Sequence, residues 1–277
     1  MYGEIRGQLV SAFCMSRRYT IASHWQYHLY GADDLNNLVP LHDQLVLGKR
    51  TLKAIFGSSP SRTLKAGELL GGAGASEAIY RLRAGWACQF HELANGRRSI
   101  LDVYLPGDVI GLDGSVHVRR LEDVRTLTAA IVETISKEDA LVELVADRSM
   151  ALYVAFLLSL RQRRSDRLLA GISSLDARGR LAMMLLDFYT RLRRRKLISG
   201  RNYNLPLSQV QIGNYLGLTV VHINRVLRSL RSEQIVEFEK HRVTILDLER
   251  LVIMARNGGK VASCAIGCEL ASNEAAA

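Results

Sequence analysis

The stretch that most constrains the fold of this chain runs from Leu205 to Leu248. Ser208 is followed three residues later by Gln211, which is the capping-box pattern of a helix start. Gly217 can end that helix, because glycine tolerates the left-handed conformation that a C-terminal cap requires. Thr219 is then a suitable N-cap for a second helix. The spacing therefore predicts two short helices joined by a tight turn.

The second of these helices has one apolar face and one polar, basic face. Its apolar residues recur at the intervals of a buried helical stripe, and they are Ile223, Val226, Leu227 and Leu230. Its other face presents Val220, Val221, His222, Asn224, Arg225, Arg228 and Arg231. Two short strands are expected next, over residues 235–238 and 242–246. This order predicts a winged helix-turn-helix, with an ordinary helical hairpin as the alternative.

Positive charge is concentrated in the same part of the chain. Residues 161–256 hold 19 Lys and Arg against 8 Asp and Glu, a net charge of +11. The remaining residues hold 18 basic and 19 acidic side chains, so they carry −1 of the total of +10. A basic region beside a neutral one indicates a polyanionic partner. Double-stranded DNA fits, because the first turn of such a helix can enter the major groove while its arginines reach phosphates or guanine edges.

The length and composition narrow the class of protein. The 277 residues allow two domains, each with its own core. No apolar run approaches the roughly 20 residues that cross a bilayer, and the first residues lack the layout of a signal peptide. We therefore expect a cytoplasmic protein with no membrane partner. We expect no enzyme either, because there is no Ser-His-Asp order, phosphate-binding loop or metal-ligand spacing on a helix.

The four cysteines are Cys14, Cys88, Cys264 and Cys268, and they form no CxxC pair and no disulfide framework. Cys264 and Cys268 lie in a tail rich in Gly, Ala and Ser over residues 257–277. We expect this tail to be a flexible terminus rather than a metal site.

Residues 47–145 are expected to form an antiparallel β-barrel or sandwich, after an N-terminal extension over residues 1–46. The apolar spacing of residues 35–56 indicates short helices that pack on the β module. Strands separated by turns are predicted over residues 77–83, 86–90, 100–105 and 127–135. Asn95-Gly96 is a strong hairpin signal. Many short strands at about ten-residue intervals are typical of a small all-β module.

Helical periodicity returns after the β module, over residues 137–144, 147–172 and 174–195. The apolar face of the longest helix has the pattern of a dimer interface, made by Met150, Tyr153, Val154, Leu157 and Leu160. Packing within one chain is the alternative. We expect a dimerisation helix over residues 146–172 and a DNA-binding domain over residues 173–256. The basic run from Arg191 to Lys196 is either a solvated helix end or a phosphate contact.

This order of elements resembles bacterial transcription regulators of the cyclic-AMP receptor protein and fumarate–nitrate regulator (Crp/Fnr) family. The resemblance covers residues 47–251 and rests on Gly67, Gly85, Asn95-Gly96-Arg97-Arg98, Leu105-Pro106-Gly107-Asp108-Val109-Ile110-Gly111, Leu205-Pro206-Leu207-Ser208-Gln209, Gly217-Leu218-Thr219 and Asn224-Arg225-Val226-Leu227. It implies an α+β fold with an N-terminal antiparallel β-barrel like that of cyclic-nucleotide-binding domains, a long dimerisation helix and a C-terminal winged helix-turn-helix. It also implies a homodimer on a two-fold DNA site, with RNA polymerase as a further partner.

The candidate DNA-contacting residues are Ser208, Gln209, Thr219, Val220, Val221, His222, Asn224, Arg225 and Arg228. Arg225 matches the later arginine of the family's recognition helix, and we assign it to a guanine or a phosphate. Ser208, Gln209 and Arg228 are assigned to the DNA backbone.

Base reading is expected to differ from the common half-site of the family. Val220 and Val221 stand where the family commonly has an arginine or a similar residue and then a glutamate. Apolar contact of these valines with thymine methyl groups, and hydrogen bonds from His222 or Asn224, are the physical options that remain.

The predicted sensor end departs further from the family. Cyclic-nucleotide binders of the family place a glutamate directly after the glycine that is Gly111 here, but this chain has Leu112. Their Arg-Ser/Thr-Ala motif is matched only by Arg120-Leu121-Glu122, in which the carboxylate of Glu122 would repel a phosphate. Arg120 is therefore a weak effector-binding candidate, and we do not expect cyclic AMP to bind.

Two other cofactors of the family are also not expected. An iron–sulfur cluster needs clustered N-terminal cysteines, and Cys14 stands alone. Haem needs a Cys or His near Gly111, which residues 112–114 do not supply, although His117 is close. The effector is unidentified, and regulation by abundance or by oxidation of Cys88 is the alternative to a ligand. A ligand-binding or interaction module with only nonspecific DNA binding is the competing interpretation of the whole chain.

Overall fold

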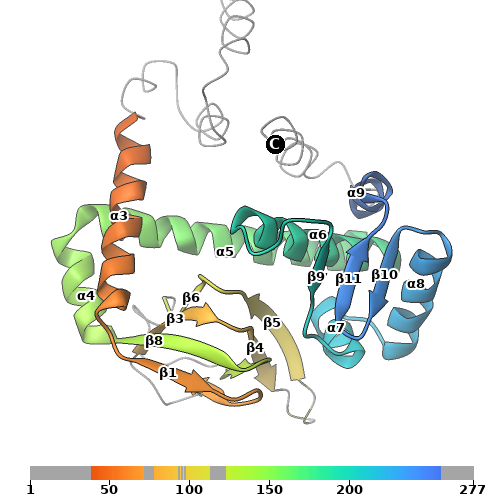
Figure 1. Cartoon of the computed structure of the whole chain (residues 1–277), viewed down its shortest axis with the longest axis horizontal. Coiled ribbons are helices and arrows are strands. Elements are labelled where there is room, and N and C mark those ends of the chain that lie inside the picture. The colour runs from red at the N-terminus through yellow and green to blue at the C-terminus, as the bar shows by residue number, and fades with distance from the viewer. Residues whose placement is uncertain are drawn as a thin grey trace, which may run out of the picture.

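The computed structural model describes residues 39–71, 78–92, 94, 96, 98–112 and 123–256. A β module lies against the first part of the long helix α5 (Arg148–Ser174), and a C-terminal unit lies at the other end of this helix (Figure 1). Helix α3 (Val39–Gly57) crosses α5 near its start and extends beyond it (Figure 1). The long helix thus joins the two parts of the molecule.

The β module consists of two four-stranded antiparallel sheets, with strand orders β1-β8-β3-β6 and β2-β7-β4-β5. The strands are β1 (Ser61–Leu64), β2 (Leu69–Gly71), β3 (Ala78–Ala84), β4 (Ala87–Glu92), β5 (Arg98–Tyr104), β6 (Val109–Ile110), β7 (Asp123–Thr126) and β8 (Ala130–Ser136). Side chains from both sheets, such as Leu82 on β3 and Val124 on β7, are buried in one cluster. The prediction of an antiparallel barrel or sandwich is confirmed, in the form of two sheets that share a core.

The predicted strand over residues 127–135 is wrong at its start. Asp123–Thr126 forms a separate strand that pairs with β4, whereas β8 begins at Ala130 and pairs with β1 and β3. The amide of Leu127 donates to the carbonyl of Trp86 over 2.7 Å, where the chain turns from one sheet to the other. The alternation of apolar residues continues through this turn, so the sequence pattern alone does not show where one strand ends and the next begins. The strands β4 and β5 pair antiparallel on either side of the Asn95-Gly96 signal; Asn95 itself lies outside the described residues.

Helix α3 is one continuous helix of 19 residues, and not the short helices that the sequence predicted. Gly48 allows the close crossing with α5, because a Cβ at this position would lie 2.0 Å from the carbonyl oxygen of Ser149. The hydroxyl of Ser149 also bonds to the side-chain oxygen of Gln44 across the crossing. The expected domain boundary after residue 46 therefore falls inside a helix that packs on α5.

Three helices come after the β module, and they are α4 (Lys137–Ala146), α5 (Arg148–Ser174) and α6 (Ala177–Arg194). Each begins at a side-chain cap, because Ser136, Asp147 and Asp176 accept hydrogen bonds from backbone amides of the first turn. Leu175 has an extended backbone, with φ −97° and ψ 147°, and it separates α5 from α6. The helix predicted to start at residue 174 therefore starts at Ala177.

The five residues predicted for a dimer interface differ in their surroundings. Met150 and Val154 are buried within the single chain, 1% and 6% exposed, in a cluster with Leu52 and Phe56 of α3. Tyr153 and Leu157 pack partly on the same cluster, and Leu160 is half-buried. The helix α3, which the sequence did not place here, covers this face. Elsewhere on α5, the large apolar side chains Phe156 and Leu169 are exposed.

The C-terminal unit contains a helical pair and a three-stranded antiparallel sheet of order β10-β11-β9. Its elements after α6 are β9 (Asn202–Asn204), α7 (Gln209–Leu216), α8 (Val220–Ser232), β10 (Val236–Glu239), β11 (Arg242–Ile245) and α9 (Leu248–Arg256). The helices α7 and α8 and the strands β10 and β11 are those that the sequence predicted. Within the part of the chain that the structure describes, no helix is long and apolar enough to cross a membrane.

Candidate nucleic-acid interface

Helix α7 begins at the predicted capping box. The amide of Gln211 donates to the hydroxyl oxygen of Ser208 over 3.2 Å, and the amide of Ser208 donates to Oε1 of Gln211 over 2.8 Å. Gly217 ends the helix in the left-handed region, with φ +66°. Ser208 is exposed and Gln209 half-buried, so both lie at the accessible N-terminus of α7. The first helix of the motif is therefore built as its sequence predicts.

The turn between α7 and α8 depends on a residue that the sequence pattern alone did not single out. The amide of Leu218 donates to the carbonyl of Gly213 over 2.9 Å. A Cβ on Gly213 would lie only 2.5 Å from the carbonyl oxygen of Leu218. Glycine at this position therefore lets the two helices approach each other. The glycine four residues before a helix-ending glycine was the available signal.

Helix α8 is capped by Thr219, whose hydroxyl oxygen accepts the amide of His222 over 3.3 Å. The same hydroxyl lies 3.1 Å from Nδ1 of His222. Of the predicted apolar stripe, Ile223, Val226 and Leu230 are buried, and Leu227 is half-buried against the same core. The opposite side of the first turn faces solvent, and it consists of Val220, Val221 and His222. An exposed first turn on a buried helix is the arrangement of a reading helix.

The three arginines of α8 have different partners. Arg225 is exposed, and the structure gives it no hydrogen bond or ion pair within the described residues. Arg228 is exposed and makes one long hydrogen bond, 3.4 Å from Nε to the carbonyl of Asn224. Arg231 instead pairs with Glu239 and Glu237 on β10, at 2.6 and 3.4 Å. Arg225 and Arg228 thus remain available to a polyanion, whereas Arg231 ties the helix to the strand pair.

The hairpin of β10 and β11 presents a cationic tip. Lys240 and His241 form a two-residue turn in which both have positive φ, 47° and 66°. Lys240, His241 and Arg242 are exposed. The sequence predicted this hairpin as a wing, but no DNA contact was assigned to its tip. The consecutive residues Lys240, His241 and Arg242 were the sequence signal that could have predicted such a contact.

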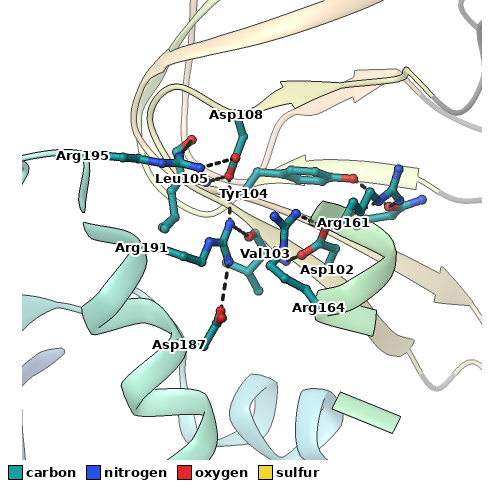
Figure 2. A network of polar contacts seen from close by, with 11 residues as sticks. Asp102, Val103, Tyr104, Leu105, Asp108, Arg161, Arg164, Asp187, Arg191 and Arg195 are labelled. Atoms are coloured by element: carbon teal, nitrogen blue, oxygen red, sulfur yellow. Dashed lines mark hydrogen bonds and ion pairs between the residues drawn. The ribbon is translucent and has the colours of Figure 1, made fainter. Parts of the chain in front are cut away.

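The basic run from Arg191 to Lys196 lies at the C-terminal end of α6. At two of its positions it is neither a solvated helix end nor a free phosphate site. Arg191 is 9% exposed, and its guanidinium lies 2.9 Å from the carboxylate of Asp108. Arg195 bonds the other oxygen of that carboxylate over 2.5 Å. Figure 2 shows both guanidinium groups converging on Asp108, which belongs to the β module. The run therefore contributes contacts between domains.

The candidate sensor residues are placed only in part. Arg120, His117, Cys14, Cys264 and Cys268 lie outside the described residues. Leu112 is buried in an apolar cluster with Ile79 and Ile135. Among the described residues, no group of three or more His, Cys, Asp or Glu side chains is arranged to hold a metal ion.

The proposed oxidation of Cys88 does not fit its environment. The side chain is 5% exposed. Burial raises the pKa of the thiol to about 11, against a smaller opposing effect of the Arg125 and Arg98 charges. A protonated, inaccessible thiol is a poor target for oxidants. The environment of Cys88 therefore argues against its oxidation, which was one of the alternatives to a ligand.

A two-sheet module, a long helix and a winged helix-turn-helix with an exposed first turn define a two-domain DNA-binding protein. The family described as cyclic nucleotide-binding domain matches residues 61–147, and the family described as Crp-like helix-turn-helix domain matches residues 179–253. The chain belongs to the Crp/Fnr family of DNA-binding transcription regulators.

Individual relatives agree with this assignment. The transcriptional regulatory protein btr of Bordetella pertussis is 28% identical over 177 residues, which cover 63% of this chain and 72% of that protein. The transcriptional activator protein Anr of Pseudomonas protegens is 28% identical over 204 residues, 72% of this chain and 81% of that protein. The solved structure of FixK2 from Bradyrhizobium japonicum shares the fold, with a TM-score of 0.63 and 22% identity over 74% of this chain and 99% of that one. The relatives are named as regulators, which supports a role other than catalysis.

Proposed function

We propose that this regulator binds DNA sequence-specifically as a homodimer, with the first half of α8 in the major groove of each half-site. The supporting observation is the division of α8 into two faces. Its apolar stripe is buried in the domain core, whereas Val221 is 67% exposed and Arg225 is exposed without a partner in the described residues. The valines would contact thymine methyl groups, and Arg225 a guanine edge or a phosphate.

Contacts to the DNA backbone would come from both ends of the reading unit. The predicted residues Ser208 and Gln209 lie at the start of α7 and Thr219 caps α8, whereas Arg228 lies about two turns further along α8. The wing tip adds Lys240 and His241, whose positions on a two-residue turn favour approach to phosphates. Each cationic contact releases counterions, so affinity should fall steeply with salt.

The homodimer would form through the solvent-facing side of α5. Phe156 is 40% exposed, and it shares a helical face with the half-buried Tyr153 and Leu160, three residues before it and four residues after it. Exposed apolar side chains of this size on one helix favour burial against a second copy. The half-buried Tyr153, Leu157 and Leu160 would border this interface, and Met150 and Val154 would support it from within the chain.

The effector of the sensor module would not be cyclic AMP. The position that would carry the ribose-binding carboxylate is Leu112, and the structure buries this side chain among Ile79 and Ile135. A carboxylate there would have to be buried in this apolar cluster, at a large free-energy cost. We also propose that the protein binds neither haem nor an iron–sulfur cluster, because the sequence lacks the ligand patterns of both. We further propose that it is cytoplasmic and that RNA polymerase is a partner.

The experiment that tests the proposal is DNase I footprinting on fragments selected by the purified protein from a random library. A regulator that reads sequence protects a discrete site with two half-sites about one helical turn apart. The competing interaction module would retain DNA by phosphate contacts alone, and would protect no discrete site. The exposed, uncharged Val220 and Val221 are the observation that keeps this second candidate in view.

A further inference from the structure

The contact between the β module and the C-terminal unit is centred on one carboxylate. Asp108, in the turn after β5, lies 2.9 Å from Arg191 on α6 and 2.5 Å from Arg195 at the C-terminal cap of that helix (Figure 2). Its Oδ2 also accepts the amide of Leu105 over 2.8 Å. The Asp108 side chain is only 11% exposed. This carboxylate is therefore held by partners from both parts of the molecule.

Both arginines also bond to backbone carbonyls near the same turn. Arg191 donates to the carbonyl of Val103 over 2.8 Å, and Arg195 donates to the carbonyls of Leu105 and Pro106 over 3.2 and 2.7 Å. Bonds from several donors to several acceptors fix the direction of approach as well as the distance. The two arginines thus set how α6 is rotated against the β module.

An aromatic contact supports the same orientation from the apolar side. The ring of Trp86, in the β module, lies edge-on to the ring of Phe188 on α6, with centroids 5.7 Å apart. Phe188 in turn lies 6.3 Å from the ring of Tyr215 on α7. Phe188 and its neighbours belong to one buried cluster that includes Val103 and Leu105 of the β module. The packing therefore continues from the β module to the first helix of the reading motif.

The covalent connection alone would not hold this orientation. Helices α5 and α6 are separated by Leu175, whose backbone is extended. A rotation about such a residue needs no broken helix and would swing α6 to α9 as a body. In the observed orientation α8 has its first turn exposed, so the contact does not cover the reading helix.

We infer that Asp108, Arg191 and Arg195 form an interdomain clamp that positions the reading helix for DNA without touching it. This inference rests on the proposed function, because it assigns the three residues a role in the affinity of that site. Specific binding by a dimer requires both reading helices in register at once. A released clamp would leave the competent orientation only partly populated and would weaken apparent affinity in proportion.

The test compares Asp108→Asn with wild type and with Glu133→Gln. Asn is isosteric and keeps one oxygen acceptor. Glu133 is a buried carboxylate, 4% exposed, that pairs with Arg81 inside the β module, so it controls for loss of a buried ion pair that does not cross the domains. We expect Asp108→Asn to bind the selected site about tenfold more weakly, with nonspecific binding and the slope of affinity against salt unchanged. Glu133→Gln should bind the selected site as wild type does.

Distance measurements between two nitroxide spin labels test the orientation of the two domains directly. A change in stability alone would not alter this distance in the folded protein. Nitroxides at Glu92→Cys and Glu249→Cys, both exposed, report the distance between the β module and the C-terminal unit. Cys14, Cys264 and Cys268 are replaced by Ser, and labelled chains are diluted with unlabelled protein. We expect a narrow distribution in wild type and a broad one in Asp108→Asn. Arg195→Gln, at a side chain 28% exposed, gives the same test if Asp108→Asn does not fold.

The outcomes separate the clamp from the proposed function. Specific affinity that is unchanged or higher in the variant, a narrow distance distribution, or an equal loss in Glu133→Gln would overturn the clamp. Wild-type protein that selects no discrete site would contradict the proposed function instead. In that case the width of the distance distribution still decides whether the clamp exists.

Discussion

Arg231, in the last turn of α8, lies 2.6 Å from the carboxylate of Glu239 on the first strand of the wing. The helix and the wing are therefore joined by an ion pair at the end of the helix away from its exposed first turn. Arg225 lies earlier on the same helix and is exposed, with no partner among the described residues. On the same helix, Arg231 thus stabilises the contact with the wing, whereas Arg225 is available to DNA.

Replacement of Arg225 should remove specific binding. We expect Arg225→Ala to cost about 1–3 kcal/mol per half-site, the usual value of one well-placed contact to a base. Arg231→Ala is the matched control, since it removes the same charge from the same helix and should change specific affinity far less. Both are measured by titration of a labelled site at two salt concentrations. Equal effects of the two substitutions, or unchanged affinity of Arg225→Ala, would remove Arg225 from the reading surface.

A charge on the free face of α5 should break the dimer. Phe156 is 40% exposed and stacks on Tyr153 with ring centroids 6.2 Å apart. We expect Phe156→Glu to reduce the mass in light scattering from two chains to one chain of 30.9 kDa, because an unpaired carboxylate would be buried at the interface. The fold should survive, with an unchanged circular dichroism spectrum. Leu157→Glu is a poorer choice, since Leu157 also packs on the chain's own core. A Phe156→Glu protein that stays dimeric would place the interface elsewhere.

The tight turn between α7 and α8 predicts a cost for a single methyl group. Gly213→Ala would place a Cβ 2.5 Å from a backbone carbonyl oxygen, so the two helices must separate. We expect it to lower the free energy of unfolding by about 1–3 kcal/mol and to weaken DNA binding. Gly200→Ala is the control in the same domain, because its Cβ would meet only the side-chain amide of Asn202 at 3.5 Å. Urea unfolding compares them, and equal stabilities of the two variants would contradict the described geometry.

The ion pairs of Asp108 predict a pH dependence. Burial alone would raise the pKa of this carboxyl, but the Arg191 and Arg195 charges outweigh it and lower the pKa to about 2. A lowered pKa contributes stability above the unfolded-state value of about 4, and the contribution disappears as the pH falls through about 2. Wild type should therefore exceed Asp108→Asn by about 2 kcal/mol at pH 7, with a difference that shrinks between pH 4 and pH 2. Urea unfolding over this range measures it, and a constant difference would disagree with the assignment.

Cys88 should be unreactive in the native protein. Its thiol is buried, with a pKa of about 11, so little thiolate exists at pH 8. In a variant with Cys14, Cys264 and Cys268 changed to Ser, we expect no reaction with Ellman's reagent until the protein unfolds in urea. A rapid reaction of Cys88 in the native protein would contradict this prediction and would again allow regulation by oxidation of this residue.

The reading motif could be predicted from the sequence because its signals are local. Ser208 and Gln211 make a capping box within one turn, and the glycine at residue 217 ends the helix where its left-handed backbone requires it. Spacings of three and four residues then identify the buried stripe of α8. Such features depend on residues close together in the sequence, so they can be predicted without knowledge of the tertiary structure.

The remaining features depend on contacts between residues far apart in the sequence. Arg191 resembles any arginine near a helix C-terminus, and only the fold brings it to Asp108, 83 positions earlier. The same applies to α3, whose Gly48 meets Ser149 across a helix crossing that periodicity does not encode. The apolar stripe with Met150 and Val154 predicts a dimer interface or packing within the chain, and only the fold shows that α3 covers these two residues.

The most direct test of sequence-specific binding by a dimer is sequencing of genomic DNA fragments retained by the purified protein at moderate salt. We predict a two-fold motif with half-sites about one helical turn apart, and loss of this motif in Arg225→Ala but not in Arg231→Ala. Retention that depends only on fragment length, with no shared motif, would contradict this prediction and would leave nonspecific phosphate binding as the activity of the reading unit.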